Sequence, residues 1–306
     1  MTELRITHES TVTEDQIDHL GHMNVRFYAV NAQAGTEALL ADLPGWGRRP
    51  YILHDVYTRH HREQLLGTPL VVRSAVLGAG AGGLRLHHEL AAADTGALAA
   101  TFVHGISPLD EGGRPAPLPD RVAAEAAALA VPPPPHAATR TISLDADPLA
   151  SAPPLATARD RGLVMRRERA VSAEECDDHG RYRVEVAPLL VWAGEPVGEG
   201  GGPILHETPD GDRLGWASME TRVQIRRLPR RGDRIQSFGA GVAVHDKVTH
   251  RVNWAFDLDR GEVLLAFETV SMAFDIRARR PVSIPEAHRR RELAALQPDL
   301  VPRAPT

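Results

Sequence analysis

The sequence predicts an α+β fold with two domains, each an antiparallel sheet wrapped around one long helix. Three observations lead to this prediction. The two halves of the chain echo each other, each half starts with an Asp-containing loop that leads to a helix-like stretch, and strand-like segments follow in succession. The length of 306 residues also exceeds the usual size of a single domain.

The repeat is visible as short segments that recur in the same order. Residues 12–21 (VTEDQIDHLG) are matched by residues 171–180 (VSAEECDDHG), so that Asp18 pairs with Asp177. Later in each half, Asp94-Thr95-Gly96 is matched by Asp259-Arg260-Gly261. Because several markers keep their order, we infer a duplicated fold.

The connection between the halves is expected over residues 123–159. This stretch is rich in Ala and Pro and contains four consecutive prolines at 132–135. A proline run is stiff and cannot join the interior of a sheet, so it predicts a surface connection. We therefore expect an N-terminal domain over residues 1–122 and a C-terminal domain over residues 160–306.

The helix of the first half is predicted over residues 24–40. Phe27, Ala34 and Ala38 fall on one side and small residues occupy much of the rest, which is typical of a largely buried helix. Gly35 within it costs about 1 kcal/mol relative to alanine, and close packing against a flat partner such as a sheet is the usual reason to keep it.

The segments that follow are rich in Val, Leu and Ala and are bounded by Gly or Asp, which predicts consecutive antiparallel strands. In the first half they are residues 70–77, 84–91 and 98–106, and in the second half residues 235–245, 249–258 and 263–274. A meander of this kind, with a helix whose apolar side needs a cover, supports the α+β class.

Composition excludes several classes of protein. Apolar residues make up 42% and charged residues 25%, which is ordinary for a folded globular chain, and the net charge of −5 argues against a nucleic-acid or membrane-surface binder. Cys176 is the only cysteine, which fits a reducing compartment. Neither a signal peptide nor a window of roughly 20 apolar residues is found, so we expect a cytoplasmic protein.

The densest cluster of reactive side chains is residues 18–28 (DHLGHMNVRFY), where a loop enters the helix. This segment resembles the hotdog-fold acyl-CoA thioesterases of the 4-hydroxybenzoyl-CoA thioesterase type. Their signature is an Asp, two residues, Gly-His, one residue, Asn, and a Tyr on the helix. The matching residues are Asp18, Gly21, His22, Asn24 and Tyr28. The two-in-one chain is similar to double-hotdog thioesterases, whereas Gln16 departs from an acidic position that is common in the family.

This cluster suits thioester cleavage. Asp18 can act as a nucleophile or as a general base on water, and a helix start offers backbone amides to an oxyanion. The resemblance implies that the amide of Val25 is that donor, that His22 and Asn24 orient the carboxylate or the thioester carbonyl, and that Tyr28 contacts substrate. The alternative is structural: Asp18 caps a turn or the helix, and its neighbours satisfy backbone groups.

Two further groups of residues are candidate contacts to the substrate, and each has a purely structural alternative. Residues 60–63 (HHRE) lie where related enzymes carry a strand that faces substrate, so His61 and Glu63 are candidate substrate contacts, with Glu63 a second carboxylate. The alternative is a solvated strand end. The basic run 226–231 (RRLPRR) could meet the phosphates of coenzyme A, or it could be a solvated turn. The histidine pairs 19/22 and 60/61 lack further ligands at the usual spacing, so neither a metal nor another cofactor is expected.

The second half keeps the acid, as Asp177, and loses its helpers. The replacements are Arg181 for His22, Arg183 for Asn24 and Ala187 for Tyr28. We expect a degenerate second site, whose domain serves as a scaffold and, as the resemblance to family dimers implies, as the other wall of the first site.

The leading function is therefore hydrolysis of an acyl-CoA or acyl-carrier-protein thioester. A hotdog hydratase or dehydratase is the second reading, although the Asp and His motif usual in that lineage is absent. A non-catalytic acyl-thioester-binding protein is the third. The fusion replaces one dimer interface, and pairing into a homodimer stays open.

Overall fold

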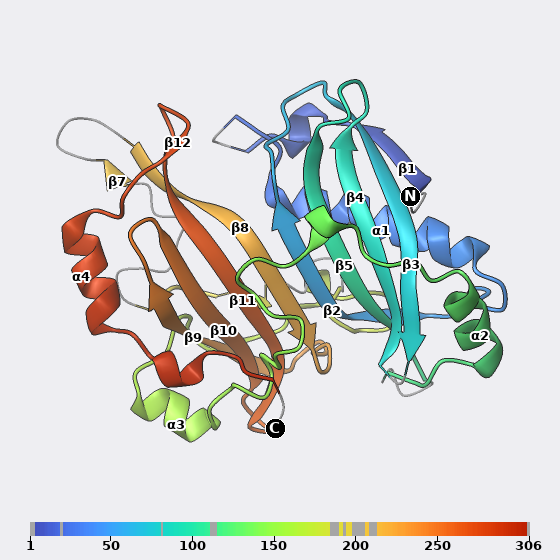
Figure 1. The fold of residues 1–306 in the computed structure, drawn as a ribbon. Helices are drawn as coiled ribbons and strands as arrows, with labels where there is room; N and C mark the ends of the chain where they lie inside the picture. Colours follow the sequence, from blue (N-terminus) through green and yellow to red (C-terminus); the bar gives the residue numbers. More distant parts are fainter. Residues whose placement is uncertain are drawn as a thin grey trace. The chain divides into compact units, whose positions relative to one another are not determined.

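The computed structural model describes residues 4–18, 21–80, 82–110, 115–183, 190–191, 194–197, 206–207 and 213–304. The chain divides into two compact units, residues 1–139 and 140–306. Both are antiparallel β-sheets with few helices, which confirms the α+β class (Figure 1).

The sheet of the first unit has the strand order β1-β3-β4-β5-β2. All of its neighbouring strands pair antiparallel. The central strands β4 and β5 are buried along almost their whole length, because both of their faces are covered. The strands are β1 (Arg5–Thr11), β2 (Tyr51–His60), β3 (Pro69–Gly80), β4 (Gly83–Ala92) and β5 (Leu98–Pro108).

The long helix of this unit, α1 (Val25–Asp42), lies along one face of the sheet against β1, β3 and β4 (Figure 1). Its buried side chains Tyr28 and Ala32 join a core with Val72 and Phe102. Each large apolar side chain removed from water here contributes on the order of 1.5–3 kcal/mol. The helix predicted over residues 24–40 is confirmed.

Gly35 explains how closely helix and sheet approach. A Cβ atom at this position would lie 2.8 Å from Cγ1 of Val72 and 3.0 Å from Oγ1 of Thr7. These neighbours belong to β3 and β1. The close packing against a sheet that the sequence predicted for Gly35 is therefore confirmed.

A buried polar network lies under α1. The Thr36 hydroxyl is 2.9 Å from Nε2 of His88 and 2.9 Å from Nδ1 of His104, and Nδ1 of His88 is 2.6 Å from the Ser74 hydroxyl. Thr36 can donate to one ring and accept from the other, so the two rings hold opposite roles toward it. Burial lowers the pKa of His104 to about 3 and that of His88 well below its usual value, so both rings are neutral.

The sheet of the second unit has the order β8-β11-β10-β9-β6, which repeats the order of the first unit element for element. The short strands β7 and β12 pair with β8 and β11. The strands are β6 (Arg169–Ala170), β7 (His206–Glu207), β8 (Arg213–Ile225), β9 (Arg234–Val244), β10 (Val248–Asp257), β11 (Glu262–Asp275) and β12 (Arg280–Pro281).

The predicted strands of both halves are observed, as β3, β4 and β5 and as β9, β10 and β11. The strands β1, β2, β6, β7, β8 and β12 were not predicted. Most of the stretch where the repeat places a second long helix, including Ala187, lies outside the described residues.

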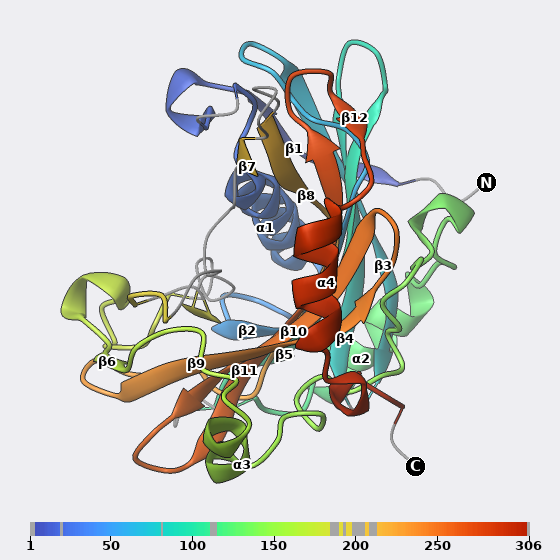
Figure 2. The same cartoon turned by 90° about the vertical axis from the view of Figure 1, so that its left-hand side faces the viewer.

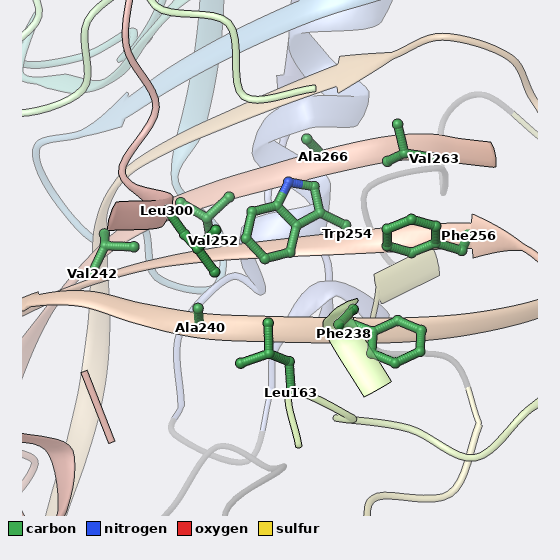
Figure 3. Close-up of a cluster of buried hydrophobic side chains, with 11 residues drawn as sticks. Leu163, Phe238, Ala240, Val242, Val252, Trp254, Phe256, Val263, Ala266 and Leu300 are labelled. Carbon is green, nitrogen blue, oxygen red and sulfur yellow. The ribbon is translucent and has the colours of Figure 1, made fainter. Parts of the chain in front are cut away.

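A core cluster of the second unit lies on β9, β10 and β11 (Figure 3). Trp254 is fully buried, and its indole N–H donates to the carbonyl of Pro148 at 3.0 Å. Phe238 and Phe256 meet edge to face at 5.4 Å, a favoured aromatic geometry. Ala158 from α3 (Leu155–Asp160) belongs to the same cluster.

Residues 123–159, expected as a connection, make packing contacts and hydrogen bonds at several points along the segment. Their first part belongs to α2 (Asp120–Ala128), which lies against β3, and Arg59 donates to the carbonyl of Ala138 at 3.0 Å. Further on, Arg222 donates to the carbonyls of Ser143 and Ala146, each at 2.7 Å. The domain limits themselves stay a prediction.

The other helical segments are short. The helix α4 (Glu286–Ala294) lies beside β9 of its own unit (Figure 2). None of the helices in the described part of the chain combines the length and apolar character that crossing a membrane requires. These segments are η1 (Glu14–Gln16), η2 (Pro135–Ala137), η3 (Ala173–Glu175), α4 (Glu286–Ala294) and η5 (Pro298–Leu300).

Candidate active site

A tight loop carries Asp18 and His22 to the start of α1. The N–H of Asp18 donates to the carbonyl of His22 at 2.9 Å, and the N–H of Gly21 donates to the carbonyl of Asp18 at 3.0 Å. Gly21 has a φ of 81°, a left-handed conformation that side-chain-bearing residues rarely adopt. The loop closure holds the two reactive residues at its two ends.

The loop is fixed to the segment that follows β2. The N–H of Met23 donates to the carbonyl of Gln64 at 2.8 Å, and the N–H of Asn24 donates to the carbonyl of Gln16 at 2.9 Å. Met23 is fully buried, and the Gln64 side chain is buried as well and donates to the carbonyl of Glu63 at 2.9 Å. These contacts bring Glu63 to the loop.

His22 lies between two carboxylates. Its Nδ1 is 3.6 Å from Oδ2 of Asp18, and its Nε2 is 3.5 Å from Oε1 of Glu63. The same Nδ1 is 3.3 Å from the carbonyl of Met23. The side chains of Asp18 and His22 are each 14% exposed and that of Glu63 is 41% exposed, so the cluster runs from a mostly buried acid to the surface.

Tyr28 forms the inner side of this cluster. Its hydroxyl donates to the carbonyl of Arg62 at 3.2 Å, and its ring meets that of His60 edge to face at 5.3 Å. Burial raises the pKa of Tyr28 to about 12, opposed by the backbone N–H of Gln64 and assisted by the negative charge of Asp18. The phenol is therefore a hydrogen-bond donor at neutral pH and not a base.

Asn24 caps α1, because its Oδ1 accepts from the N–H of Arg26 at 3.1 Å. The N–H of Val25 makes no hydrogen bond to any of the described residues, and Val25 is 50% exposed. A backbone donor at the positive end of a helix, within reach of solvent, suits a developing negative charge.

His61 lies in other surroundings. Its Nε2 is 3.4 Å from the Thr101 hydroxyl, and the charges that act on it belong to Arg59, His136 and Glu89. Burial is the largest of the effects that lower the pKa of His61. His60, which the sequence interpretation passed over, is the histidine that contacts Tyr28, and the alternation of side chains along a strand could have separated the two.

The corresponding loop of the second unit has the same backbone. The N–H of Asp177 donates to the carbonyl of Arg181 at 2.7 Å, and the N–H of Gly180 donates to the carbonyl of Asp177 at 2.9 Å. The N–H of Tyr182 donates to the carbonyl of Pro229 at 2.8 Å. Pro229 therefore takes the place of Gln64, and Leu228 takes that of Glu63.

The side chains of this second loop satisfy one another. Oδ1 of Asp177 accepts from the N–H groups of His179 and Arg181, each at 2.9 Å, and its Oδ2 is 3.1 Å from Nε of Arg181. Burial acts against the charged form, but the hydrogen bonds and charge of Arg181 lower the pKa of Asp177. Unlike Asp18, this carboxylate lies beside a guanidinium instead of an imidazole.

Across the described ranges, no three His, Cys, Asp or Glu side chains are arranged to hold one metal ion.

The N-terminal unit is similar in sequence to a known family. Residues 12–126 match the sequence model of the Thioesterase-like superfamily. That match contains the whole Asp18 loop, α1 and the strands β2 to β5. No curated protein matches the chain.

Solved structures resemble a larger part of the chain. The 12:0-ACP thioesterase from Umbellularia californica is similar with a TM-score of 0.58 and 11% identity, over 87% of this chain and 93% of that one. An acyl-ACP thioesterase from Bacteroides thetaiotaomicron is similar with a TM-score of 0.56 and 11% identity, over 86% and 96%. At these identities the likeness shows a shared fold.

Proposed function

We propose that this protein hydrolyses acyl thioesters, with Asp18 as the reacting carboxylate. The observation that carries the proposal is the grouping of Asp18, His22 and Glu63 at the N-terminus of α1. The match of residues 12–126 to the Thioesterase-like superfamily and the fold shared with acyl-ACP thioesterases support it.

The chemistry needs a nucleophile or base and a donor for the oxyanion. The Asp18 carboxylate either attacks the thioester carbonyl carbon or takes a proton from the water that attacks it. The carbonyl oxygen becomes an oxyanion, which the N–H of Val25 stabilises, and the C–S bond then breaks to release the thiolate. If Asp18 is the base, the acid forms directly and the proton that Asp18 took from water passes to the thiolate. If Asp18 is the nucleophile, the acyl group remains on it as a mixed anhydride, the thiolate takes a proton from solvent, and water hydrolyses the anhydride to release the acid and restore the carboxylate. In other enzymes, removal of one hydrogen-bond donor to the oxyanion lowers the rate by about 10² to 10³.

The other residues position this centre. His22 holds the carboxylate of Asp18 on one side and meets Glu63 on the other. Glu63, the more exposed acid, serves as a second carboxylate that can exchange protons with water. Tyr28 donates a hydrogen bond to the carbonyl of Arg62, beside Glu63, and Asn24 fixes the first turn of α1 through its cap.

Finer assignments belong to the same proposal. We infer a tandem pair of hotdog units from the shared strand order, and the 4-hydroxybenzoyl-CoA thioesterase type from the motif around Asp18. Because Asp177 is paired with Arg181 and Leu228 stands at the position of Glu63, we infer that the second site is degenerate. The substrate is an acyl-CoA or an acyl-carrier-protein thioester, and the structural neighbours described as ACP thioesterases favour testing both. We expect hydrolysis to occur in the cytoplasm.

The test is release of free thiol from a panel of acyl-CoA and acyl-carrier-protein thioesters. Asp18→Asn is expected to lower kcat by about 10² or more. Asp177→Asn is the matched control, because it makes the same change in the same backbone loop, and it is expected to keep kcat within about 2-fold. Equal rates for the natural chain and Asp18→Asn, or no hydrolysis of any thioester, would contradict the proposal.

A further inference from the structure

The turn after β8 differs in charge from its counterpart in the first unit. Equivalent backbone hydrogen bonds align the two turns residue by residue. The N–H of Thr68 donates to the carbonyl of Leu65 at 3.1 Å, and the N–H of Asp233 donates to the carbonyl of Arg230 at 3.0 Å. Likewise, the backbone N–H of His61 donates to the carbonyl of Ala99, and the backbone N–H of Arg226 donates to the carbonyl of Leu264. The matched positions are therefore His61 and Arg226, Leu65 and Arg230, and Leu66 and Arg231.

The turn carries four arginines, and three of them have exposed guanidinium groups without a partner among the described residues. Arg226, Arg230 and Arg231 are exposed, and within the described parts of the chain their side chains form no hydrogen bond or ion pair. Arg227 differs, because its guanidinium is held by Asp233 at 3.1 Å and Asp257 at 2.5 Å. Both acids also contact Arg260, so they are committed to Arg227 and Arg260, and the charges of Arg226, Arg230 and Arg231 are not neutralised within the described residues.

The backbone holds these charges next to another one. Arg230 and Arg181 are bridge partners on antiparallel segments, and the N–H of Arg231 donates to the carbonyl of Gly180 at 3.0 Å. Side chains of directly opposed residues lie close together, and like charges in that arrangement are destabilising. Asp177 compensates Arg181. Nothing in the described residues compensates Arg230, whereas a bound anion would.

Arginine points to a particular anion. A guanidinium presents planar paired donors that match phosphate oxygens, and it keeps its charge at any physiological pH. The protein as a whole is acidic, with a net charge of −5, so the turn is a local feature and not part of a generally basic surface. Backbone hydrogen bonds at Arg226, Pro229 and Arg231 also fix the backbone of the turn, which keeps the three side chains on one short segment.

We propose that Arg226, Arg230 and Arg231 form a phosphate-binding site on the turn between β8 and β9. The ligand is either the phosphate-bearing nucleotide of coenzyme A, a source that rests on the proposed function, or a free inorganic phosphate species. The site stands in the place that Leu65 and Leu66, which are 56% and 59% exposed, occupy in the first unit. The degenerate copy has thus exchanged an apolar turn for a phosphate-binding one.

The test measures binding of pyrophosphate, inorganic phosphate and coenzyme A by titration calorimetry at low salt. The variant R226Q/R230Q/R231Q is compared with R48Q/R85Q/R290Q, which removes the same charge from three other exposed positions. We expect the first variant to weaken pyrophosphate binding by about 10-fold or more and the second to change it by about 2-fold or less. Circular dichroism checks that both fold.

The pattern of ligands separates the sources. Coenzyme A that binds more tightly than pyrophosphate, and depends on the same arginines, assigns the site to the coenzyme; pyrophosphate that binds at least as tightly assigns it to free phosphate species. No binding of any phosphate, equal loss in both variants, or capture of an acidic carrier protein alone would overturn the proposal. Hydrolysis of an acyl-pantetheine thioester, which has no phosphate, reports on the Asp18 site separately and should not change in R226Q/R230Q/R231Q.

Discussion

Nε2 of His22 lies 3.5 Å from Oε1 of Glu63, which joins the loop before α1 to the segment after β2. The contact exists because the N–H of Met23 donates to the carbonyl of Gln64 and so fixes the two segments together. His22 is thereby placed between Glu63 and Asp18, and the geometry around it can be tested residue by residue.

Glu63→Gln should lower kcat for thioester hydrolysis by about 10- to 100-fold with little change in KM. The amide keeps the size of the side chain but can no longer carry a proton between His22 and water. Steady-state kinetics on the best substrate of the panel would measure this. Glu14→Gln, at an exposed position of η1, is the control and should leave kcat unchanged. A kcat equal to that of the natural chain would assign Glu63 to a solvated strand end.

Asn24→Ala should destabilise the fold by about 1 kcal/mol, because α1 loses the side-chain oxygen that accepts from the N–H of Arg26. It should also lower kcat, since the first turn of α1 carries the amide of Val25. Asn24→Asp keeps an acceptor at the cap and is expected to restore stability. Urea unfolding and kinetics on both variants test this, and loss of kcat without loss of stability would separate Asn24 from capping.

The buried histidines predict the direction of a pH effect on stability. His88 and His104 have folded-state pKa values lowered by burial, to about 3 for His104, so the unfolded chain binds more protons below its own pKa of about 6.5. Their contribution is complete above that pH and is lost as the pH falls. From pH 7.5 to 5.5 the free energy of unfolding should drop by about 2–3 kcal/mol for the pair.

Urea unfolding at the two pH values measures this drop together with the contribution of His60, whose pKa burial also lowers, to about 4. His8→Gln removes a histidine of β1 from outside the network, so this variant should show the same drop as the natural chain. A free energy of unfolding that does not change between pH 7.5 and 5.5 would contradict a neutral, buried pair.

Gly35→Ala should destabilise the protein by about 1–3 kcal/mol, although alanine favours a helix by about 1 kcal/mol. The new methyl group would lie 2.8 Å from Cγ1 of Val72, a distance that forces helix and sheet apart. Thermal or urea unfolding measures the change. Glu37→Ala, on the exposed side of the same helix, should change stability by about 0.5 kcal/mol or less, and a stabilised Gly35→Ala would show that the contact can relax.

The sequence by itself determined the features that depend on local patterns. Side-chain periodicity and bounding Gly or Asp residues predicted α1 and six of the strands, because helix and strand repeats are short enough to be read along the chain. The recurrence of the Asp18 segment at Asp177 indicated the duplication. The spacing from Asp18 to Tyr28 identified the candidate site, since one loop and one helical turn bring those residues together.

Only the tertiary structure decided which distant residues meet. Strand order, register and the hydrogen bond from Met23 to Gln64 bring Glu63 to His22, and they place His60 rather than His61 on Tyr28. The Thr36 network depends on how α1 lies on the sheet. No local period encodes such contacts, because a shift of one residue in strand register moves every side chain to the opposite face.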